Sequence, residues 1–328
     1  MRTDPRVLVT GSSGTIGTAL AERLLAEGWD VVGADRVPNR WSSVVDARTV
    51  AVDLRDRAAT DALPANVDVV VHLAANARVT DLIERPEKAR DNLETTVTAL
   101  EYARERDVSG VVFASSREVY GDQSGTARGE GDTSIEDCKN PYAASKVGGE
   151  AMTRSYAQCY GLDATVLRFS NVYGRYDVTD RVVPLFLAQA ARGEDLTVYG
   201  RDKVVDLTYI DDLVDGIVRT LADFETAAGE TFNLGSGTGT SLLSLAEAVT
   251  DRFPTGSDVR VERNRTGEVE RFVADISRAR AVLGYEPTRS PLGGLDPAID
   301  WYRENDLLGA VDPGAVPDGN PRGAIETN

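Results

Sequence analysis

Short apolar segments alternate with longer amphipathic segments along the first half of the chain. Valine-rich apolar runs of this length predict strands that are buried on both faces of a sheet. They lie at 7–10, 31–35, 50–52, 67–74, 110–115 and 164–170, and helix-like segments separate them at 15–27, 56–63, 87–106 and 141–160. Such alternation is typical of a parallel sheet covered by helices on both sides. The fold class that we expect is therefore α/β.

The second half of the chain has a more mixed pattern. It predicts a helix at 183–192, an edge strand at 196–199, a strand-to-helix step at 205–222, a strand at 231–235 and helices at 241–252, 277–283 and 294–303. We expect a smaller, mixed α/β domain interleaved with the first. The expected limits are 1–175 plus 204–235 for the first domain and 176–203 plus 236–308 for the second. Residues 309–328, rich in glycine, proline and aspartate without periodicity, are expected to be a disordered tail.

A glycine-rich turn joins the first predicted strand to the first predicted helix. Gly11, Gly14 and Gly17 allow a tight turn there and a close approach of a pyrophosphate to the helix N-terminus. Asp35 ends the next strand, near the position where an acid binds a ribose hydroxyl in Rossmann folds. We therefore expect a doubly wound Rossmann sheet that binds a dinucleotide. Asp35 would repel a 2′-phosphate and so favours NAD over NADP, whereas Arg36 weakens that preference.

Other strand ends carry weaker signals for the same cofactor. Asp53 can accept from an adenine amino group while Leu54 packs on the ring, although a plain turn aspartate fits equally well. The small residues of the Leu73-Ala74-Ala75 segment would let a cofactor lie against the backbone, or they simply pack well. We interpret the neighbouring His72 as a satisfied core side chain.

The residues with the clearest chemical pattern are Tyr142 and Lys146. Their spacing places both on one face of a helix that starts after Pro141. A nearby cation lowers the pKa of a tyrosine, and the charge of a nicotinamide would add to this effect. Tyr142 then becomes a candidate general base that works near neutral pH. Ser116, at the end of the fifth strand, is placed to hydrogen-bond the same substrate hydroxyl.

Composition and charge exclude several classes of protein. With 41% hydrophobic residues, the 328-residue chain is able to form a core, and its net charge of −17 argues against nucleic acid as a partner. Only four of its 36 basic residues are lysines. Excess acid with scarce lysine is typical of a halophilic protein, since hydrated carboxylates keep it soluble in high salt. The alternative is an acidic protein from a GC-rich genome.

Metal, hydrolytic and membrane functions find little support. A single histidine excludes a multi-histidine metal site and a Ser-His-Asp triad. Cys138 and Cys159 form neither a metal-ligand spacing nor a disulfide framework. No apolar run is long enough to span a membrane, and no secretory leader is evident. We expect a cytoplasmic protein without a metal.

Six motifs together resemble the extended short-chain dehydrogenase/reductase family, in its nucleotide-sugar epimerase/dehydratase branch. They are TGSSGTIG (10–17), HLAA (72–75), SSREVYG (115–121), PYAASK (141–146), RFSNVYG (168–174) and LTYIDD (207–212). The resemblance covers about residues 6–305. It implies a catalytic triad of Ser116, Tyr142 and Lys146, an NAD cofactor and a nucleotide-sugar substrate. It also implies a homodimer that pairs the helices at 87–106 and 141–160.

The resemblance further assigns residues to the cofactor and the substrate. Residues implied near NAD are Gly11, Ser13, Gly14, Thr15, Ile16, Gly17, Asp35, Arg36, Asp53, Leu54, Leu73, Ala74, Ala75, Asn92, Ser115, Tyr142, Lys146 and Phe169. Those implied near the substrate are Asn171 and Arg265 on the diphosphate, Val183 and Tyr199 around the base, Glu268 on a ribose, and Arg117. Asn92 also helps to position the active site.

One arginine typical of the family is missing. Relatives carry Arg-Asp before the Phe-Thr-Tyr strand, and that arginine binds phosphate, whereas this chain has Val205-Asp206. Arg201, Lys203 or Arg181 can substitute for it, or each is an ordinary surface charge.

The reaction depends on the two residues after Ser116. The shared first step is oxidation at C4 of the sugar, and a 4-epimerase needs little beyond the triad. A 4,6-dehydratase has Thr-Asp-Glu here, so Arg117 in place of the aspartate argues against dehydration. A UDP-glucuronate decarboxylase has Thr-Ser-Glu, which Glu118 fits as a further catalytic candidate and Arg117 does not. The alternative for Arg117 and Glu118 is a local ion pair.

We therefore expect an NAD-dependent nucleotide-sugar 4-epimerase, acting on a UDP-hexose. The alternatives are a UDP-uronate decarboxylase or epimerase and, after them, a 4,6-dehydratase. A non-catalytic, NAD-binding regulatory protein is the alternative from another class. It would have no use for Ser116, Tyr142 and Lys146 together.

Overall fold

The structure, a computed structural model, describes residues 5–121, 127–263 and 269–308. Arg265, Glu268 and the tail at 309–328 lie outside these residues.

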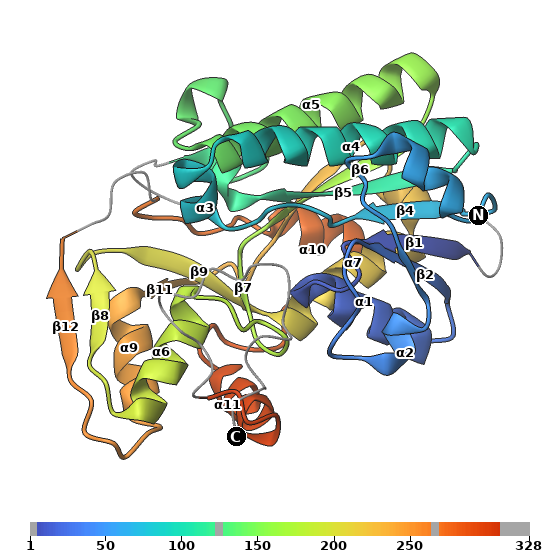
Figure 1. Cartoon of the computed structure of the whole chain (residues 1–328). Coiled ribbons are helices and arrows are strands. Elements are labelled where there is room, and N and C mark those ends of the chain that lie inside the picture. The colour runs from blue at the N-terminus through green and yellow to red at the C-terminus, as the bar shows by residue number, and fades with distance from the viewer. Residues whose placement is uncertain (1–4, 122–126, 264–268, 309–328) are drawn as a thin grey trace.

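A seven-stranded parallel sheet forms the centre of the molecule (Figure 1). Its order is β10-β6-β5-β4-β1-β2-β3, the doubly wound Rossmann order extended by one strand. The strands are β1 (Arg6–Thr10), β2 (Asp30–Asp35), β3 (Thr49–Ala51), β4 (Val69–His72), β5 (Gly110–Ser116), β6 (Asp163–Phe169) and β10 (Thr231–Leu234). The α/β fold class predicted from the sequence is confirmed.

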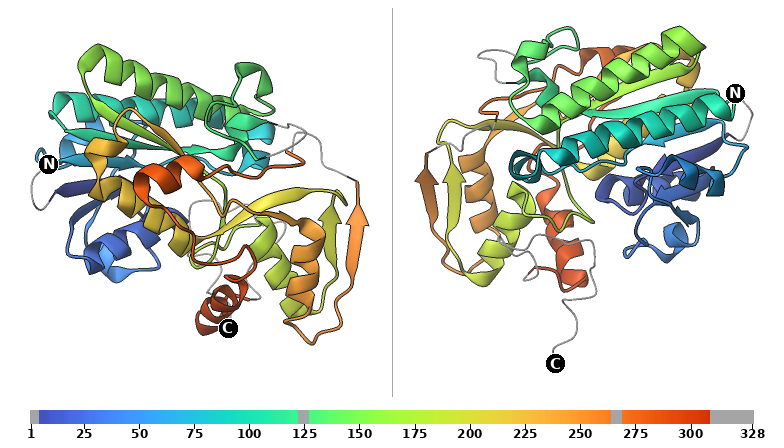
Figure 2. Two further views of the ribbon diagram at one scale, coloured as in Figure 1. Left: turned by 180° about the vertical axis from the view of Figure 1, so that it is seen from behind. Right: turned by 45° about the horizontal axis from the view of Figure 1, so that its top comes forward.

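Helices cover both faces of this sheet. On one face α4 (Glu87–Glu105) and α5 (Pro141–Tyr160) lie side by side, and on the other α1 (Thr15–Ala26) packs beside α7 (Ile210–Ala222) (Figures 1 and 2). The remaining helices here are α2 (Ser43–Asp46), α3 (Val79–Glu84), α8 (Phe224–Ala227) and α10 (Ser277–Leu283). The helix expected at 56–63 is a 3₁₀ helix, η1 (Arg57–Ala62).

Two small sheets lie beside the large one. One is three-stranded, in the order β11-β9-β7, with β9 (Val204–Tyr209) between β7 (Asn171–Tyr173) and β11 (Gly239–Ser241). The other pairs β8 (Leu196–Tyr199) with β12 (Val259–Glu262), and its neighbours are α6 (Val182–Arg192) and α9 (Leu242–Thr250). A last helix, α11 (Leu295–Glu304), follows. The expected smaller, mixed region is therefore present, with β9 in its three-stranded sheet and β10 in the large one.

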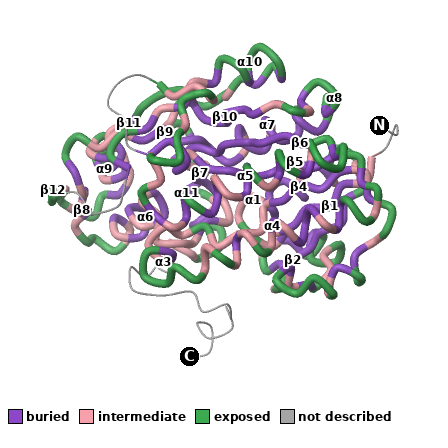
Figure 3. Tube along the Cα trace, turned by 90° about the horizontal axis from the view of Figure 1, so that it is seen from above, coloured by how far each residue is buried: buried purple, intermediate pink, exposed green. Residues whose placement is uncertain are grey.

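The strands of the large sheet place alternate side chains in two apolar clusters, as the period of two along a strand requires. Val7 and Val9 of β1 pack in the cluster that includes Leu20 of α1, whereas Leu8 packs in the one that includes Leu100 of α4. The central strands are buried while the outer faces of the helices are exposed (Figure 3). This explains why the strands are apolar throughout and the helices only on one side.

His72 lies inside this core, as predicted. Its Nδ1 is 2.9 Å from the hydroxyl of Thr10, and its Nε2 is 3.2 Å from the hydroxyl of Thr96. Burial, with a smaller contribution from the charge of Lys146, lowers the pKa of His72 to about 3. The imidazole is therefore neutral over the physiological range.

A single histidine makes this state easy to test by NMR. We expect the one imidazole signal to show no titration between pH 8 and pH 5. Because the unfolded chain binds a proton at about pH 6.5 and the folded one does not, stability should fall below that pH, by up to about 1.4 kcal/mol per pH unit. His72→Leu, followed by urea unfolding, should lose this part of the pH dependence. A titration midpoint near 6.5 would contradict the assignment.

A buried ion pair fastens α5 to the sheet. Arg168 of β6 donates from Nη2 to Oε2 of Glu150 at 2.7 Å and from Nε to Oε1 at 2.8 Å. The hydroxyl of Ser115 on β5 donates to the same Glu150 at 2.6 Å. Burial alone would lower the pKa of Arg168, but Glu150 more than offsets it, and the net pKa is raised. The side chains of Arg168 and Glu150 are only 2% and 6% exposed, so the pair is shielded from water.

Removing one partner should cost more than removing both. We expect Glu150→Leu to lower the free energy of unfolding by about 3–5 kcal/mol, because it leaves a buried guanidinium without an anion. The double variant Glu150→Leu/Arg168→Met should lose clearly less than the sum of the two single variants in urea unfolding. Additive losses would show that the pair acts as two independent side chains.

Candidate active site

The three predicted catalytic residues meet where β5 ends and α5 begins. Ser116 is the last residue of β5, and Tyr142 and Lys146 lie in the first two turns of α5. The helix starts where the sequence dictates: the side chain of Asn140 accepts from the amide of Ala143 at 2.8 Å, and proline occupies the next position. All three catalytic candidates are buried.

The pKa of Tyr142 differs from the sequence-based expectation. It is raised, because burial penalises the phenolate more than the surroundings stabilise it. The positive charge of Arg181, the hydroxyl of Ser116 and the charge of Arg117 all act to lower it. Lys146 is not among the groups with the largest influence on this pKa. Its ammonium group donates to the carbonyl of Ala114 at 2.8 Å instead.

Two opposing influences act on the pKa of Lys146. Burial lowers its pKa to about 8, and the carboxylate of Glu150, one turn further along α5, raises it. Its Nζ lies 5.8 Å from the ring centroid of Tyr142 and 5.2 Å from that of Phe113. The ammonium group is therefore close to the phenol without pairing with it.

Asn92 of α4 ties the loop after β4 to the catalytic helix. Its side chain accepts from the amide of Asn76 at 2.7 Å and donates to the carbonyl of the same residue at 3.1 Å. It also donates to the hydroxyl of Ser145, which in turn donates to the carbonyl of Tyr142. This geometry supports the positioning role expected for Asn92.

Arg117 and Glu118 form a local ion pair, which was one of the alternatives that the sequence analysis gave for them. Arg117 Nη2 lies 2.8 Å from Oε1 of Glu118, and the side chain of Asn140 donates to Oε2 of Glu118 at 3.1 Å. Arg117 Nε donates to Oδ1 of Asn171 at 2.6 Å. Glu118 is thus held by two donors, and Arg117 joins it to the residue predicted to bind the diphosphate.

The glycine turn is packed as a dinucleotide site requires. Gly11 has a φ of +72°, and a Cβ on it would lie 2.9 Å from the amide nitrogen of Ala74. A Cβ on Gly17 would lie 2.0 Å from the carbonyl oxygen of Gly11. Side chains at these two positions would clash with backbone atoms, so the turn packs closely against the start of α1 and the loop after β4. Asp35 accepts from the amide of Ser13 at 3.0 Å, which places its carboxylate beside this turn.

A cavity of about 440 Å³ lies where β2 and β3 end. Arg36, Val37, Ala51, Val52 and Asp53 line it. The carboxylate of Asp53 is paired with Arg55 at 2.6 Å, and this hydrogen bond lowers its pKa. Asp53 therefore already has one cationic partner at the wall where an adenine is expected. Leu54 is buried in the cluster below this wall.

The remaining residues that we expected around NAD are buried or half-buried. The hydroxyl of Thr15 donates to the carbonyl of Tyr176, and the hydroxyl of Ser115 is used by Glu150. Phe169 is buried opposite Ser116 in the β5–β6 register. Half-buried positions beside the turn and after β4 are occupied by Ile16, Leu73, Ala74 and Ala75.

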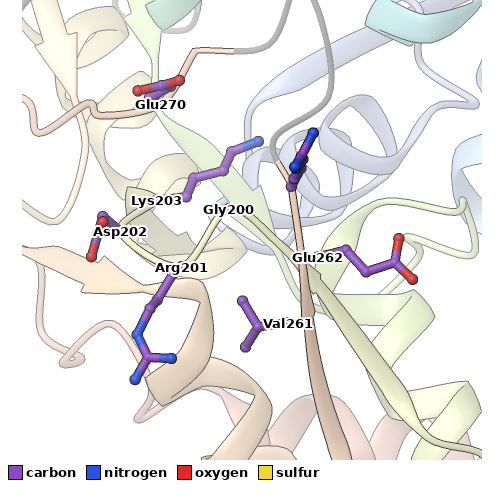
Figure 4. A pocket seen from close by; sticks show the side chains of 8 residues that line it. Gly200, Arg201, Asp202, Lys203, Val261, Glu262 and Glu270 are labelled. Atoms are coloured by element: carbon purple, nitrogen blue, oxygen red, sulfur yellow. The ribbon is translucent and has the colours of Figure 1, made fainter.

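Those predicted substrate-side residues that the structure describes lie in separate places. Val183 lies in the apolar core, whereas Tyr199 ends β8 next to a cavity of about 740 Å³ (Figure 4). This cavity is lined by Gly200, Arg201, Asp202, Lys203, Val261, Glu262, Arg263 and Glu270. Two of the three candidates for the missing phosphate arginine, Arg201 and Lys203, are therefore found here. The third, Arg181, acts on Tyr142 instead.

Two features of the site were not singled out from the sequence. Asn140 caps α5 and holds Glu118, and the Asn-Pro dipeptide before a helix was the available signal. The Glu150–Arg168 pair had no local signal, because its partners come from different elements. Within the described residues, no group of acidic, histidine or cysteine side chains is arranged to hold a metal, and no helix is long and apolar enough to cross a membrane.

Comparisons with known proteins agree with this geometry. A family model described as the NAD dependent epimerase/dehydratase family matches residues 7–235. The UDP-glucose 4-epimerase of Mycolicibacterium smegmatis is 33% identical, over 91% of this chain and 98% of that protein. A dTDP-glucose 4,6-dehydratase of Streptomyces antibioticus is 32% identical, over 91% and 92%.

A solved structure extends the agreement to the cofactor. The UDP-glucose 4-epimerase of Thermus thermophilus, in complex with NAD, superposes with a TM-score of 0.81 at 30% identity, over 91% of this chain and 99% of that one. The turn, the strand-end serine and the Tyr-x-x-x-Lys helix are thus found in a chain that belongs to the NAD-dependent epimerase/dehydratase family and uses NAD as its cofactor.

Proposed function

We propose that the protein is a nucleotide-sugar 4-epimerase, with a UDP-hexose as its substrate. The observation that carries the proposal is that Ser116, Tyr142 and Lys146 are buried together at the carboxyl end of β5. In addition, the residue after Ser116 is an arginine rather than an acid. Only a proton-transfer group and a hydride acceptor are needed to epimerise C4. NAD, when bound, supplies the hydride acceptor at the sugar carbon.

Tyr142 is the group that moves the proton. As a phenolate it takes the proton of the C4 hydroxyl, and it returns the proton after the 4-keto sugar has presented its other face. Ser116, which hydrogen-bonds the phenol, holds the same hydroxyl. Because burial raises the pKa of Tyr142, its phenolate depends on neighbouring cations, namely Arg181, Arg117 and the bound cofactor ring.

The surroundings of Glu118 argue against a lyase. Elimination of water across C5 and C6 needs a free acid and a free base beside those carbons. The side chain of Glu118 is instead paired with Arg117 and hydrogen-bonded by Asn140, and the neighbouring position carries an arginine rather than an acid. We therefore assign Glu118 a positioning role and favour the isomerase over the dehydratase or decarboxylase.

The proposed assembly is a homodimer in which α4 and α5 pair with the same helices of a second copy, as the family resemblance implies. The proposed setting is a cytoplasm of high salt, since the net charge of −17 would cost stability at low ionic strength.

Removing the phenolic hydroxyl should stop the reaction while leaving the cofactor in place. We expect Tyr142→Phe to lower kcat by roughly 10²–10⁴-fold, the usual contribution of a general base. Bound NAD, measured by absorbance and release on denaturation, should stay at the wild-type level. Normal turnover by this variant would overturn the mechanism.

Glu118→Gln separates the isomerase from the lyases. It keeps the acceptor for Asn140, so we expect turnover to fall by less than about tenfold, against the roughly 10²–10⁴-fold loss of a proton-transfer residue. Wild type and variant should be given UDP-, GDP-, CDP- and dTDP-sugars, with products analysed by chromatography and mass. The product should have unchanged mass. Loss of water or carbon dioxide would identify a lyase.

A further inference from the structure

Two guanidinium groups lie near Tyr142, the proposed base. Neither of them transfers a proton or a hydride in the epimerisation step. Arg117 directly follows Ser116 at the start of η2 (Arg117–Tyr120), and Arg181 directly precedes α6. They come from segments far apart in the sequence, yet the charges of both act on the phenol of Tyr142. Both side chains also contact segments of the site: Arg117 donates to Asn171, and Nη2 of Arg181 lies 3.4 Å from the carbonyl oxygen of Ala77, in the loop after β4 that Asn92 holds.

Arg117 has donor capacity that the described residues leave unused. Its Nε donates to Asn171 and its Nη2 pairs with Glu118, but the buried Nη1 finds no acceptor among the described residues. A buried donor without an acceptor costs free energy that an added acceptor recovers. The guanidinium lies 5.9 Å from the ring centroid of Phe272, and the whole side chain is 14% exposed.

Arg181 is more open and only loosely held. Its side chain is 40% exposed, its Nη2 lies 3.4 Å from the carbonyl oxygen of Ala77, and its Nη1 lies 3.9 Å from Oδ2 of Asp177. Both contacts are long for a guanidinium, whose charged hydrogen bonds are normally below 3 Å. Glu118 pairs closely with Arg117, at 2.8 Å, whereas the carboxylate of Asp177 is 3.9 Å from Arg181 and holds it less closely.

The position of these groups relative to the reacting hydroxyl indicates which anion they fit. In a pyranose, the substituent on C5 is next to the C4 hydroxyl, whereas the diphosphate on C1 is across the ring. The anion nearest to a hydroxyl that meets Tyr142 is therefore one carried on C5. A planar carboxylate matches the forked donors of a guanidinium.

We propose that Arg117 and Arg181 bind a carboxylate on C5 of the sugar, so that the substrate is a nucleotide hexuronate. This inference rests on the proposed 4-epimerase function and narrows its hexose to the form oxidised at C6. Arg117 contacts the side-chain oxygen of Asn171 and not its NH2 group, so this arrangement leaves Asn171 able to donate to the diphosphate. The carboxylate would supply the acceptor that the buried Nη1 of Arg117 needs.

The test compares two ligands that differ only at C6. Tyr142→Phe with bound NAD is titrated with UDP-glucuronate and with UDP-glucose in a calorimeter, so that no turnover interferes. We expect UDP-glucuronate to bind at least about tenfold more tightly, as one added charged hydrogen bond implies. When either Arg117→Gln or Arg181→Gln is added to the Tyr142→Phe variant, this preference should fall by about tenfold. Arg303→Gln, which removes an exposed guanidinium of α11, is the matched control and should leave it unchanged.

Binding of UDP alone distinguishes the two possible anions. If the arginines bind the C5 carboxylate, the affinity for UDP should change by less than about threefold in either variant. A parallel loss of UDP affinity would mean that they bind the diphosphate and would overturn the inference. Equal binding of the two sugars, or no binding of either, would also overturn it. Arg117→Lys, which keeps the charge, should retain part of the preference, and circular dichroism checks that each variant is folded.

Turnover of nucleotide sugars by wild type tests the proposed 4-epimerase function separately from carboxylate binding. If wild type turns over no nucleotide sugar, the epimerase assignment fails while the binding comparison still stands. If wild type epimerises UDP-glucose as efficiently as UDP-glucuronate, the epimerase assignment holds and the role of the arginines fails.

Discussion

The buried pair between Glu150 and Arg168 is the interaction on which the geometry of the site depends. Glu150 is one turn after Lys146 on α5, and its carboxylate is shared by Arg168 of β6 and Ser115 of β5. The first turns of α5 are thereby fixed against the end of β5, where Ser116 lies. A low-dielectric surrounding strengthens such a pair and makes its loss costly. The buried ion pair thus helps to hold Tyr142 next to Ser116.

The same burial that strengthens this pair works against the charged forms of the catalytic residues. It raises the pKa of Tyr142, lowers that of Lys146 to about 8 and lowers that of His72 to about 3. Since the imidazole of His72 is neutral, it adds no charge near Lys146. The phenolate depends on cations around it, which makes the neighbouring arginines part of the electrostatic balance of the site.

The doubly wound sheet explains why cofactor turn and catalytic residues converge. Parallel strands end at one edge, and the order reverses between β1 and β4, so the loops after β1 and β4 leave a crevice there. Gly11 packs against Ala74 at that crevice, while Ser116 ends a strand of the same sheet. The small sheets add a second wall, with Asn171 reaching Arg117 from β7.

The sequence alone determined the features that depend on a few consecutive residues: the alternating strands and helices, the glycine turn, the Tyr-x-x-x-Lys spacing and the capped start of α5. Only the tertiary structure decided the others. The strands β7 (NVY), β11 (GTS) and β12 (VRVE) contain no continuous apolar run that would have marked them. The partner of Arg168 is on another element. The approach of Arg181 to Tyr142 and the net rise in the pKa of Tyr142 depend on packing between distant segments, because burial and charge sum over neighbours that no local pattern specifies.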